Sequence, residues 1–300
     1  MCDELLHRRY GHLSQKNLTC LIETGMVDGM NKTSKSRDSD VTVICESCVE
    51  GRQTRKPFER GHVGKRSTRI LELVHTDVCG TVTKYFVSFI DDWSRFVKVY
   101  PIATKDTMLE CFEEYIAIVE AQFERRVSCV RCDNSSEYRG SFMKFCRKKG
   151  IQVEYTVPYT PEQNGVSERM NRTLVEKARS MLVLSGVSKR FWSEAIETAA
   201  YLTNRSPASA LEQGKTPCEL WSGLKPNISS LCIVGCTAHC HIPKEYRKKL
   251  DSKSWKGVFV GYAKNGYRIF DPRDWKVKIL RDVVVFDENI GGKISKGAVG

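Results

Sequence analysis

The chain has 300 residues, enough for two or three domains, and 41% of them are hydrophobic while 28% are charged. This composition excludes an intrinsically disordered chain. The sequence contains no run of 18 apolar residues, so no transmembrane helix is predicted. Lysine and arginine outnumber aspartate and glutamate by 48 to 36, a net charge of +12. We therefore expect nucleic acid as a partner and no membrane contact.

Cysteine usage and the first residues bear on the compartment. The 13 cysteines are an odd number without a compact disulfide spacing, which favours a reducing environment where thiols are buried or bound to metal. Leu5 and Leu6 are followed at once by His7, Arg8 and Arg9, so no apolar leader is predicted. We expect an intracellular protein.

Two basic stretches divide the chain. Residues 51–69 carry seven Lys or Arg against one Glu, and glycine and proline interrupt any regular period, which is typical of a linker. A second basic cluster contains Lys244, Arg247, Lys248, Lys249, Lys253 and Lys256. We predict an N-terminal module at 1–60, a basic linker at 61–69, a central domain at 70–225 and a small β-rich region at 226–300.

The N-terminal module contains a metal-binding pattern. His7 and His12 precede Cys45 and Cys48 of "CESC", and two imidazoles with two thiolates form the tetrahedral set that structural zinc prefers. Residues five apart on one helix point about 140° from each other, so Gly11 has to interrupt the helix. The alternative is two surface histidines and two unrelated thiols. The spacing favours a structural zinc ion, because four protein ligands leave no position for a substrate.

The central domain alternates strands and helices. Three strands are predicted at 70–78, 85–91 and 95–101, with turns at 79–84 and 92–94. Further elements follow in the order helix 106–123, strand 127–132, helix 142–149, strand 151–157, and helices 165–185 and 190–204. This order predicts an α/β class, the RNase H-like mixed five-stranded sheet with flanking helices, beside the small zinc-binding helical module and the β-rich C-terminal part.

Three acids fall where that fold brings elements together. Asp77 lies near the end of the first predicted strand, Asp133 just past the fourth, and Glu168 in the first turn of helix 165–185. If the first and fourth strands are neighbours, the aspartates lie side by side and the helix brings Glu168 to them. Two Mg²⁺ ions about 4 Å apart would suit such a site and an in-line attack on a phosphodiester. Alternatively, the aspartates only end strands and Glu168 only complements the helix dipole.

Other groupings are weaker candidates. Asp91 and Asp92 of "IDDWSR" stand at a hairpin turn, where Asp is common for backbone reasons. The cysteines of "CVRC" at 129–132 lie in an apolar β-type run, where thiols commonly pack in the core. The segment "CTAHCH" at 236–241 alternates like a strand. We do not expect these groups to bind metal or to act in catalysis.

The helix that carries Glu168 also presents cations. Arg172 and Arg179 lie within about 40° of Glu168 around the helix, opposite an apolar stripe. The loop before it offers Tyr159, Gln163 and Asn164, whose ring and amides suit contacts with DNA. We predict that these five residues contact DNA, the arginines through phosphates.

Several segments together resemble the integrase region of a Ty1/copia-type retrotransposon Pol polyprotein. They are "HRRYGHLSQKNL", "CESCVEGRQTRKPF", "LELVHTDVCG", "FIDDWSRFVKVYP", "RCDNSSEY", "PYTPEQNGVSERMNRTL", "FWSEAIETAAYLTNRSP" and "KSWKGVFVGYAKNGYRIFDP". The resemblance covers almost the whole chain. It implies a zinc-binding pre-integrase module, an RNase H-like catalytic core and a small β-rich C-terminal part. Carried over by motif, it implies zinc on His7, His12, Cys45 and Cys48, and a catalytic triad of Asp77, Asp133 and Glu168.

The resemblance also implies an activity and partners. Such an enzyme is a metal-dependent polynucleotidyl transferase that trims element DNA ends and joins them to target DNA, with structural Zn²⁺ and catalytic Mg²⁺ or Mn²⁺. It implies double-stranded DNA as substrate, both element ends and target, a homo-oligomer, other Pol products as partners, and location in a cytoplasmic particle and the nucleus.

The chain departs from the family pattern in three places. The connection "TVTK" after Gly80 is shorter than usual, and the spacing from Asp133 to Glu168 is one residue shorter. Ser135 and Ser136 stand where the family commonly has glycines. Two other functions therefore stay open: a degenerate or co-opted DNA-binding copy without catalysis, and a plain RNase H-like nuclease. The intact triad favours catalysis, and the zinc module with the C-terminal strands favours joining over hydrolysis.

Overall fold

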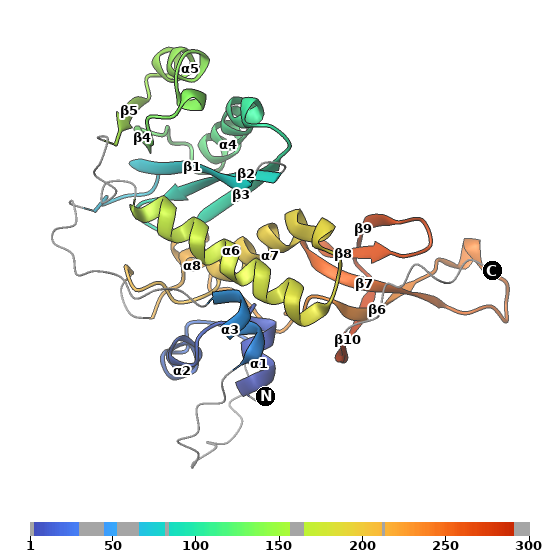
Figure 1. Ribbon diagram of the computed structural model, residues 1–300. Helices are drawn as coiled ribbons and strands as arrows, with labels where there is room; N and C mark the ends of the chain where they lie inside the picture. Colours follow the sequence, from blue (N-terminus) through green and yellow to red (C-terminus); the bar gives the residue numbers. More distant parts are fainter. Residues whose placement is uncertain are drawn as a thin grey trace. The chain divides into compact units, whose positions relative to one another are not determined.

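The structure is a computed structural model that describes residues 3–29, 45–52, 66–81, 84–156, 165–211 and 214–290. Figure 1 shows its helices and strands. The chain divides into two compact units. The core unit consists of Arg55–Leu174 and Thr203–Pro226, and the flanking unit of Met1–Thr54, Val175–Leu202 and Asn227–Gly300. The domain boundaries expected at 60, 69 and 225 stay a prediction.

The core unit is built on a mixed five-stranded sheet in the order β3-β2-β1-β4-β5. The strands are β1 (Leu73–Thr81), β2 (Lys84–Asp91), β3 (Val97–Ile102), β4 (Cys129–Cys132) and β5 (Gln152–Tyr155). The first three form an antiparallel meander, whereas β4 pairs in parallel with both β1 and β5. This arrangement confirms the predicted RNase H-like fold class.

Two helices of the core unit cover one face of this sheet (Figure 1). The remaining elements of the unit are η1 (Lys105–Thr107), α4 (Met108–Phe123), η2 (Ser136–Tyr138), α5 (Ser141–Lys149) and α8 (Pro217–Ser222). Phe112, Ile116 and Val119 of α4 are buried against the sheet, as their spacing of three and four residues predicts. Phe142 and Cys146 bring α5 into the same core.

The first strand runs further than predicted. Cys79 and Gly80 still pair with β2, and the last pair is Thr81 with Lys84, so the turn expected over 79–84 is wrong. Asp77 therefore stands in the middle of β1 and not near its end. Pairing of β1 with β4, however, extends only over Leu73–His75. Asp77 thus lies two residues beyond the part of β1 that pairs with β4, in the part of β1 that pairs only with β2 among the named strands.

The flanking unit contains an antiparallel sheet in the order β10-β6-β7-β8-β9. The strands are β6 (Cys236–His241), β7 (Ser254–Ala263), β8 (Gly266–Asp271), β9 (Lys276–Leu280) and β10 (Val283–Ile290), with η4 (Lys244–Tyr246) between the first two. Val258, Val260 and Phe270 of this sheet pack against Val187 and Phe191. The β-rich C-terminal part is therefore confirmed.

Helices complete the flanking unit. They are α1 (Asp3–Arg9), α2 (Gln15–Thr24), α3 (Glu46–Arg52), η3 (Lys189–Phe191) and α7 (Trp192–Asn204) up to Leu202. α6 (Gly165–Ser185) begins in the core unit, and its residues from Val175 onward belong to the flanking unit. Leu174, Ala178 and Met181 are at most 3% exposed, which confirms the apolar stripe predicted for α6.

Candidate catalytic and metal sites

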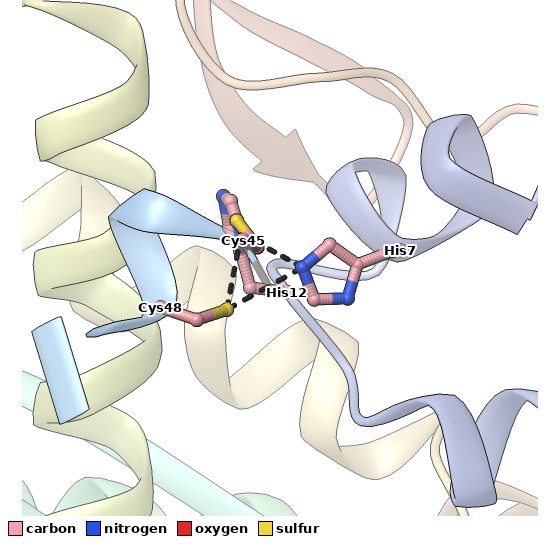
Figure 2. A group of neighbouring side chains, drawn as sticks. All are labelled: His7, His12, Cys45 and Cys48. Carbon is pink, nitrogen blue, oxygen red and sulfur yellow. Dashed lines mark hydrogen bonds between the residues drawn. The ribbon is translucent and has the colours of Figure 1, made fainter. Parts of the chain in front are cut away.

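Two histidines and two cysteines converge in the flanking unit. His7 lies on α1, His12 follows it, Cys45 directly precedes α3 and Cys48 lies in its first turn. One donor atom from each lies within 4.8 Å of the other three. His12 Nδ1 is 3.1 Å from His7 Nε2, 3.3 Å from Cys45 Sγ and 3.4 Å from Cys48 Sγ. Figure 2 shows the four side chains pointing at one another.

The turn between the histidines makes this convergence geometrically possible. Gly11 and His12 both adopt the left-handed region, with φ of 58° and 65°, so the helix stops between the two imidazoles as predicted. A Cβ at position 11 would lie 2.9 Å from Leu202 Cδ1. Both the backbone conformation and the space therefore require glycine there. The expectation that Gly11 interrupts the helix is confirmed.

The donor set fits structural zinc. His7 Nδ1 donates a hydrogen bond to the Leu13 carbonyl at 2.7 Å, which fixes the tautomer and leaves Nε2 as the ligand atom. Two imidazole nitrogens and two sulfurs at contact distance are the ligands of a closed tetrahedral zinc site. It is the one group of this kind found among the described residues. With four protein ligands the site has a structural and not a catalytic character.

The three predicted acids come from three elements of the core unit. Asp77 lies on β1, Asp133 directly follows β4, and Glu168 lies in the first turn of α6. In the parallel pairing, Leu73 faces Cys129 and His75 faces Arg131. The same offset of 56 residues relates Asp77 to Asp133, but the pairing itself ends at His75 and Arg131, and Asp133 lies one residue past the end of β4.

The acids influence one another electrostatically. The pKa of Asp77 is raised from 3.8 to about 6, mainly by burial and next by the charge of Asp133, with a further contribution from Glu168. A hydrogen bond that Asn171 Nδ2 donates to Asp77 Oδ2 at 2.8 Å opposes this rise. The charges of Asp133 and Glu168 thus reach Asp77, and we call these three acids the acidic cluster; among the described residues, however, only the histidine–cysteine group has its ligand atoms close enough together to hold a metal ion as the structure stands. Hard oxygen ligands at high charge density fit Mg²⁺ or Mn²⁺.

Two contacts at this cluster were not predicted. Asn171 is 3% exposed and stands three residues after Glu168, on the same side of α6. This spacing is the signal that sequence analysis missed. Ser135, one of the serines that replace family glycines, donates to Asp133 Oδ1 through its hydroxyl at 2.6 Å and its backbone N–H at 3.2 Å. Asn171 and Ser135 therefore each hold one carboxylate of the cluster.

The rival acids Asp91 and Asp92 have structural surroundings. Both are buried. Asp92 accepts hydrogen bonds from His75 Nε2 at 2.9 Å and from the Ser67 N–H at 2.8 Å, and pairs with Arg95 at 3.0 Å. Burial alone would raise the pKa of Asp92, but these partners hold it well below its usual range.

Asp91 uses its carboxylate to close the hairpin. It accepts from the Ser94 N–H at 2.7 Å and the Ser94 hydroxyl at 2.6 Å, and from the Leu71 N–H at 2.8 Å. This is the turn chemistry expected of aspartate at such a position. The two acids therefore stabilise the β2–β3 turn and the chain before β1.

The remaining sequence candidates have different surroundings. Arg172 is exposed, whereas Arg179 donates to the Gly51 carbonyl at the end of α3 at 2.9 Å. Tyr159, Gln163 and Asn164 lie outside the described residues. Contacts of all five with DNA stay a prediction.

The two cysteine groupings set aside above pack in cores. Cys132 is fully buried, and burial raises the pKa of Cys129 to about 12. Cys236 and Cys240 are fully buried on β6. High thiol pKa values disfavour the thiolate that metal binding needs. These cysteines therefore behave as small apolar residues of the two sheets.

Comparison with known proteins gives the family. Residues 3–53 match the GAG-pre-integrase domain, and residues 236–297 match the retroviral polymerase SH3-like domain. Over 96% of its length the chain is 41% identical to the retrovirus-related Pol polyprotein from transposon TNT 1-94 of Nicotiana tabacum. The chain belongs to the Ty1/copia-type retrotransposon integrases. The corresponding polyprotein from transposon RE1 of Arabidopsis thaliana is 29% identical over 94% of the chain.

These matches concern a part of longer proteins. The chain covers 22% of the tobacco polyprotein and 19% of RE1. A chain of the simian T-cell lymphotropic virus intasome in complex with PP2A regulatory subunit B56 gamma is 18% identical, with a TM-score of 0.46, over 79% of this chain and 85% of that chain. That similarity is too distant to support an assignment. No helix within the described residues is long and apolar enough to cross a membrane.

Proposed function

We propose that the chain is a DNA integrase, a metal-dependent polynucleotidyl transferase whose catalytic residues are Asp77, Asp133 and Glu168. The observation that carries this proposal is the raised pKa of Asp77, about 6, caused by burial and by the charges of the other two acids. A perturbed carboxyl with other acids near it, as at Asp77, is typical of a site that uses its charge, because a fold gains no stability from such repulsion.

End trimming would be a hydrolysis and joining a transesterification. In each step the attacking oxygen, of water or of a DNA 3′-hydroxyl, forms a bond to phosphorus and loses its proton to solvent, while the 3′ oxygen of the attacked strand leaves with the electron pair and takes up a proton. When bound, two divalent cations, Mg²⁺ or Mn²⁺, would supply Lewis acids for both oxygens. The chain's own part is to hold the carboxylates. Asn171 fixes one oxygen of Asp77, and Ser135 fixes one oxygen of Asp133.

The partners follow from this proposal. Double-stranded DNA, as element ends and as target, is the substrate that the net charge of +12 favours. Joining two ends to one target calls for a homo-oligomer and for other Pol products nearby, in a cytoplasmic particle and then in the nucleus. A structural Zn²⁺ ion on His7, His12, Cys45 and Cys48 would hold the pre-integrase module.

The test is a strand-transfer assay with end-matched duplex DNA in Mg²⁺ or Mn²⁺. Glu168→Gln keeps the size of the side chain and removes its charge, so joining should fall by at least about a hundredfold while folding is preserved. Glu176→Gln, further along α6, is the matched control and should join like the wild type. A dipole role alone would cost Glu168→Gln about 0.3–1 kcal/mol of stability and leave joining intact.

The outcomes separate the candidate functions. If Glu168→Gln joins within about threefold of wild type, the proposed triad is wrong. Cleavage without joining would indicate a plain RNase H-like nuclease. If wild type binds DNA but neither joins nor cleaves it, the chain is a non-catalytic DNA-binding copy.

A further inference from the structure

A cavity of about 520 Å³ lies on the flanking unit, apart from both clusters described above. Its wall includes Tyr201 of α7, Tyr262 and Tyr267 of the β7–β8 hairpin, Lys264 and Asn265 of the hairpin turn, and Arg281 between β9 and β10. None of the residues that line it is acidic. Its volume lies in the range of small-molecule sites, about 300–1,000 Å³.

The aromatic wall is held in place by hydrogen bonds. Tyr262 stacks on Tyr201 with ring centroids 4.2 Å apart and an angle of 14°. The Tyr262 hydroxyl accepts from the Cys232 N–H at 2.9 Å and donates to the Cys232 carbonyl at 3.2 Å. The Tyr267 hydroxyl donates to the Ser230 carbonyl at 3.3 Å. These rings are fixed before any ligand arrives, which lowers the entropic cost of binding against them.

The cationic wall carries charge that the protein leaves uncompensated. Lys264 and Arg281 are exposed, and within the described residues neither forms an ion pair. Arg268, Arg273 and Lys278 on the same sheet are instead each paired with an acid. The Ala263–Gly266 pair closes the β7–β8 hairpin, so Lys264 stands at its tip. Fixed aromatic rings and uncompensated cations therefore face one cavity.

We propose that this cavity binds a nucleotide of single-stranded DNA, with the base against the tyrosine rings and its phosphates held by Lys264 and Arg281. Every base has a π-face that stacks on aromatic side chains, and single-strand sites combine such platforms with basic grooves. Duplex DNA hides its bases in the stack and offers only its phosphates. Methylated lysine, the other common ligand of tyrosine clusters, is repelled by the two cations.

The proposal adds to the proposed function the form of DNA that is bound. It rests on the proposed function only in taking DNA as the nucleic acid. Unpaired nucleotides occur wherever a strand end is trimmed or displaced. The cavity uses none of the three acids. Binding measured without added divalent metal therefore succeeds or fails independently of strand transfer.

The experiment measures binding of a fluorescent 15-nucleotide thymidine oligomer to the full chain by anisotropy, over a range of salt concentrations. The double variant Lys264→Ala/Arg281→Ala should weaken binding at least about fivefold. It should also reduce the slope of log Kd against log salt by about 1.4, because each of the two phosphate contacts contributes about 0.7 to that slope. Tyr201→Leu should weaken binding about fivefold or more with the slope unchanged. The control Lys148→Ala/Lys276→Ala removes the same charge at exposed positions outside the cavity.

Two further measurements separate a nucleotide site from a general basic surface. Binding of a duplex of the same length should fall less than twofold in Lys264→Ala/Arg281→Ala. Oligomers with 5-iodouracil should crosslink under light to Tyr201 or Tyr267, and peptide mapping identifies the residue. A uridine oligomer that loses affinity equally would support the cavity and extend it to RNA. Equal losses for duplex and single strand, unchanged affinity in both cavity variants, or crosslinks only elsewhere would overturn the proposal.

Discussion

The two ligand clusters of this chain are built in opposite ways. At the histidine–cysteine cluster four donor atoms, two imidazole nitrogens and two sulfurs, lie within 4.8 Å of one another. At the acidic cluster each carboxylate comes from a different element, and Asp77 has a pKa of about 6 because burial and the other acids oppose its charge. A metal ion bound at the first cluster would stabilise the folded N-terminal module. At the second cluster the carboxylate charges repel one another, and a bound cation would reduce that repulsion.

A third group of acids sharpens this contrast. Asp92 is buried and Asp77 is partly buried, yet the pKa of Asp92 lies well below the usual range because His75, Ser67 and Arg95 surround it with donors. Burial is the largest cause of the raised pKa of Asp77, as it is for Asp91, and the charges of Asp133 and Glu168 add to it at Asp77. The difference lies in the neighbours, which are donors around Asp92 and other acids around Asp77. This difference makes the acidic cluster a candidate functional site.

The largest expected effect concerns the zinc cluster. Cys48→Ser replaces a thiolate by a hydroxyl that is a poor zinc ligand, so the chain should lose its zinc and the N-terminal helices should unfold. Zinc binding supplies about 10–16 kcal/mol in small zinc modules at neutral pH. Zinc content by mass spectrometry and helicity by circular dichroism measure both effects. Cys20→Ser on α2 lies outside the ligand set and should keep one zinc per chain. A Cys48→Ser variant that lacks zinc and stays folded would contradict a structural role for the ion.

The next effect concerns Asp77. In the metal-free protein at pH 8, Asp77→Asn should raise the free energy of unfolding by about 1–3 kcal/mol. The reason is that it removes a carboxylate whose pKa is raised by about two units. The lower end of this range allows for solvent screening of a partly exposed group. Urea unfolding measures this gain. Asp282→Asn, at an exposed position, should change stability by less than about 0.5 kcal/mol.

The pH dependence gives this prediction a definite sign. The pKa of Asp77 is about 6 in the folded protein and near 3.8 in the unfolded chain, so the folded state binds the proton more tightly. The stability contributed by the protonated acid is complete below about pH 4 and is lost as the pH rises through 6. The gain from Asp77→Asn should therefore shrink below pH 6 and nearly vanish at pH 4. A gain that stays constant with pH would point to packing and not to charge.

The smallest effect concerns Asn171. Asn171→Ala removes the hydrogen bond that stabilises ionised Asp77, so the pKa of Asp77 should rise above about 6 by up to about one unit. Carbon-13 NMR titration of the aspartate carboxyls measures this pKa. Thr173→Ala is the control, because the Thr173 hydroxyl donates to the Arg169 carbonyl of its own helix. An unchanged Asp77 pKa in Asn171→Ala would show that the contact has no electrostatic role.

The sequence predicts these two clusters to different depths. The zinc ligands follow from short spacings around Gly11 and "CESC", since ligand geometry restricts which spacings converge. The partnership of Asp77 and Asp133 follows once β1 and β4 are neighbours, a consequence of the predicted fold. The contact of Asn171 with Asp77 depends on how α6 lies over the sheet. The spacing of three residues from Glu168 places Asn171 on the same side of α6, but it does not specify the hydrogen bond to Asp77.

Other features could not be predicted from the sequence because they depend on contacts between distant segments. The length of β1 beyond Asp77 depends on pairing with β2, which continues past the point where β4 ends. The bond between Arg179 and Gly51 joins segments 128 residues apart. The cavity at Tyr201 has its wall from α7 and from the C-terminal sheet, and Tyr201 lies about 60 residues before Tyr262 and Tyr267, so the three tyrosines form no sequence motif.

If Asp77, Asp133 and Glu168 act as one cation site, the Asp77 carboxyl should respond to the ion. Carbon-13 NMR follows this carboxyl between pH 4 and 8, with and without 10 mM Mg²⁺, in wild type and Glu168→Gln. We expect a pKa of about 6 without the ion, a marked fall when Mg²⁺ is added, and a smaller fall in Glu168→Gln because one ligand charge is missing. An Asp77 pKa that Mg²⁺ leaves unchanged in the wild type would contradict a shared cation site.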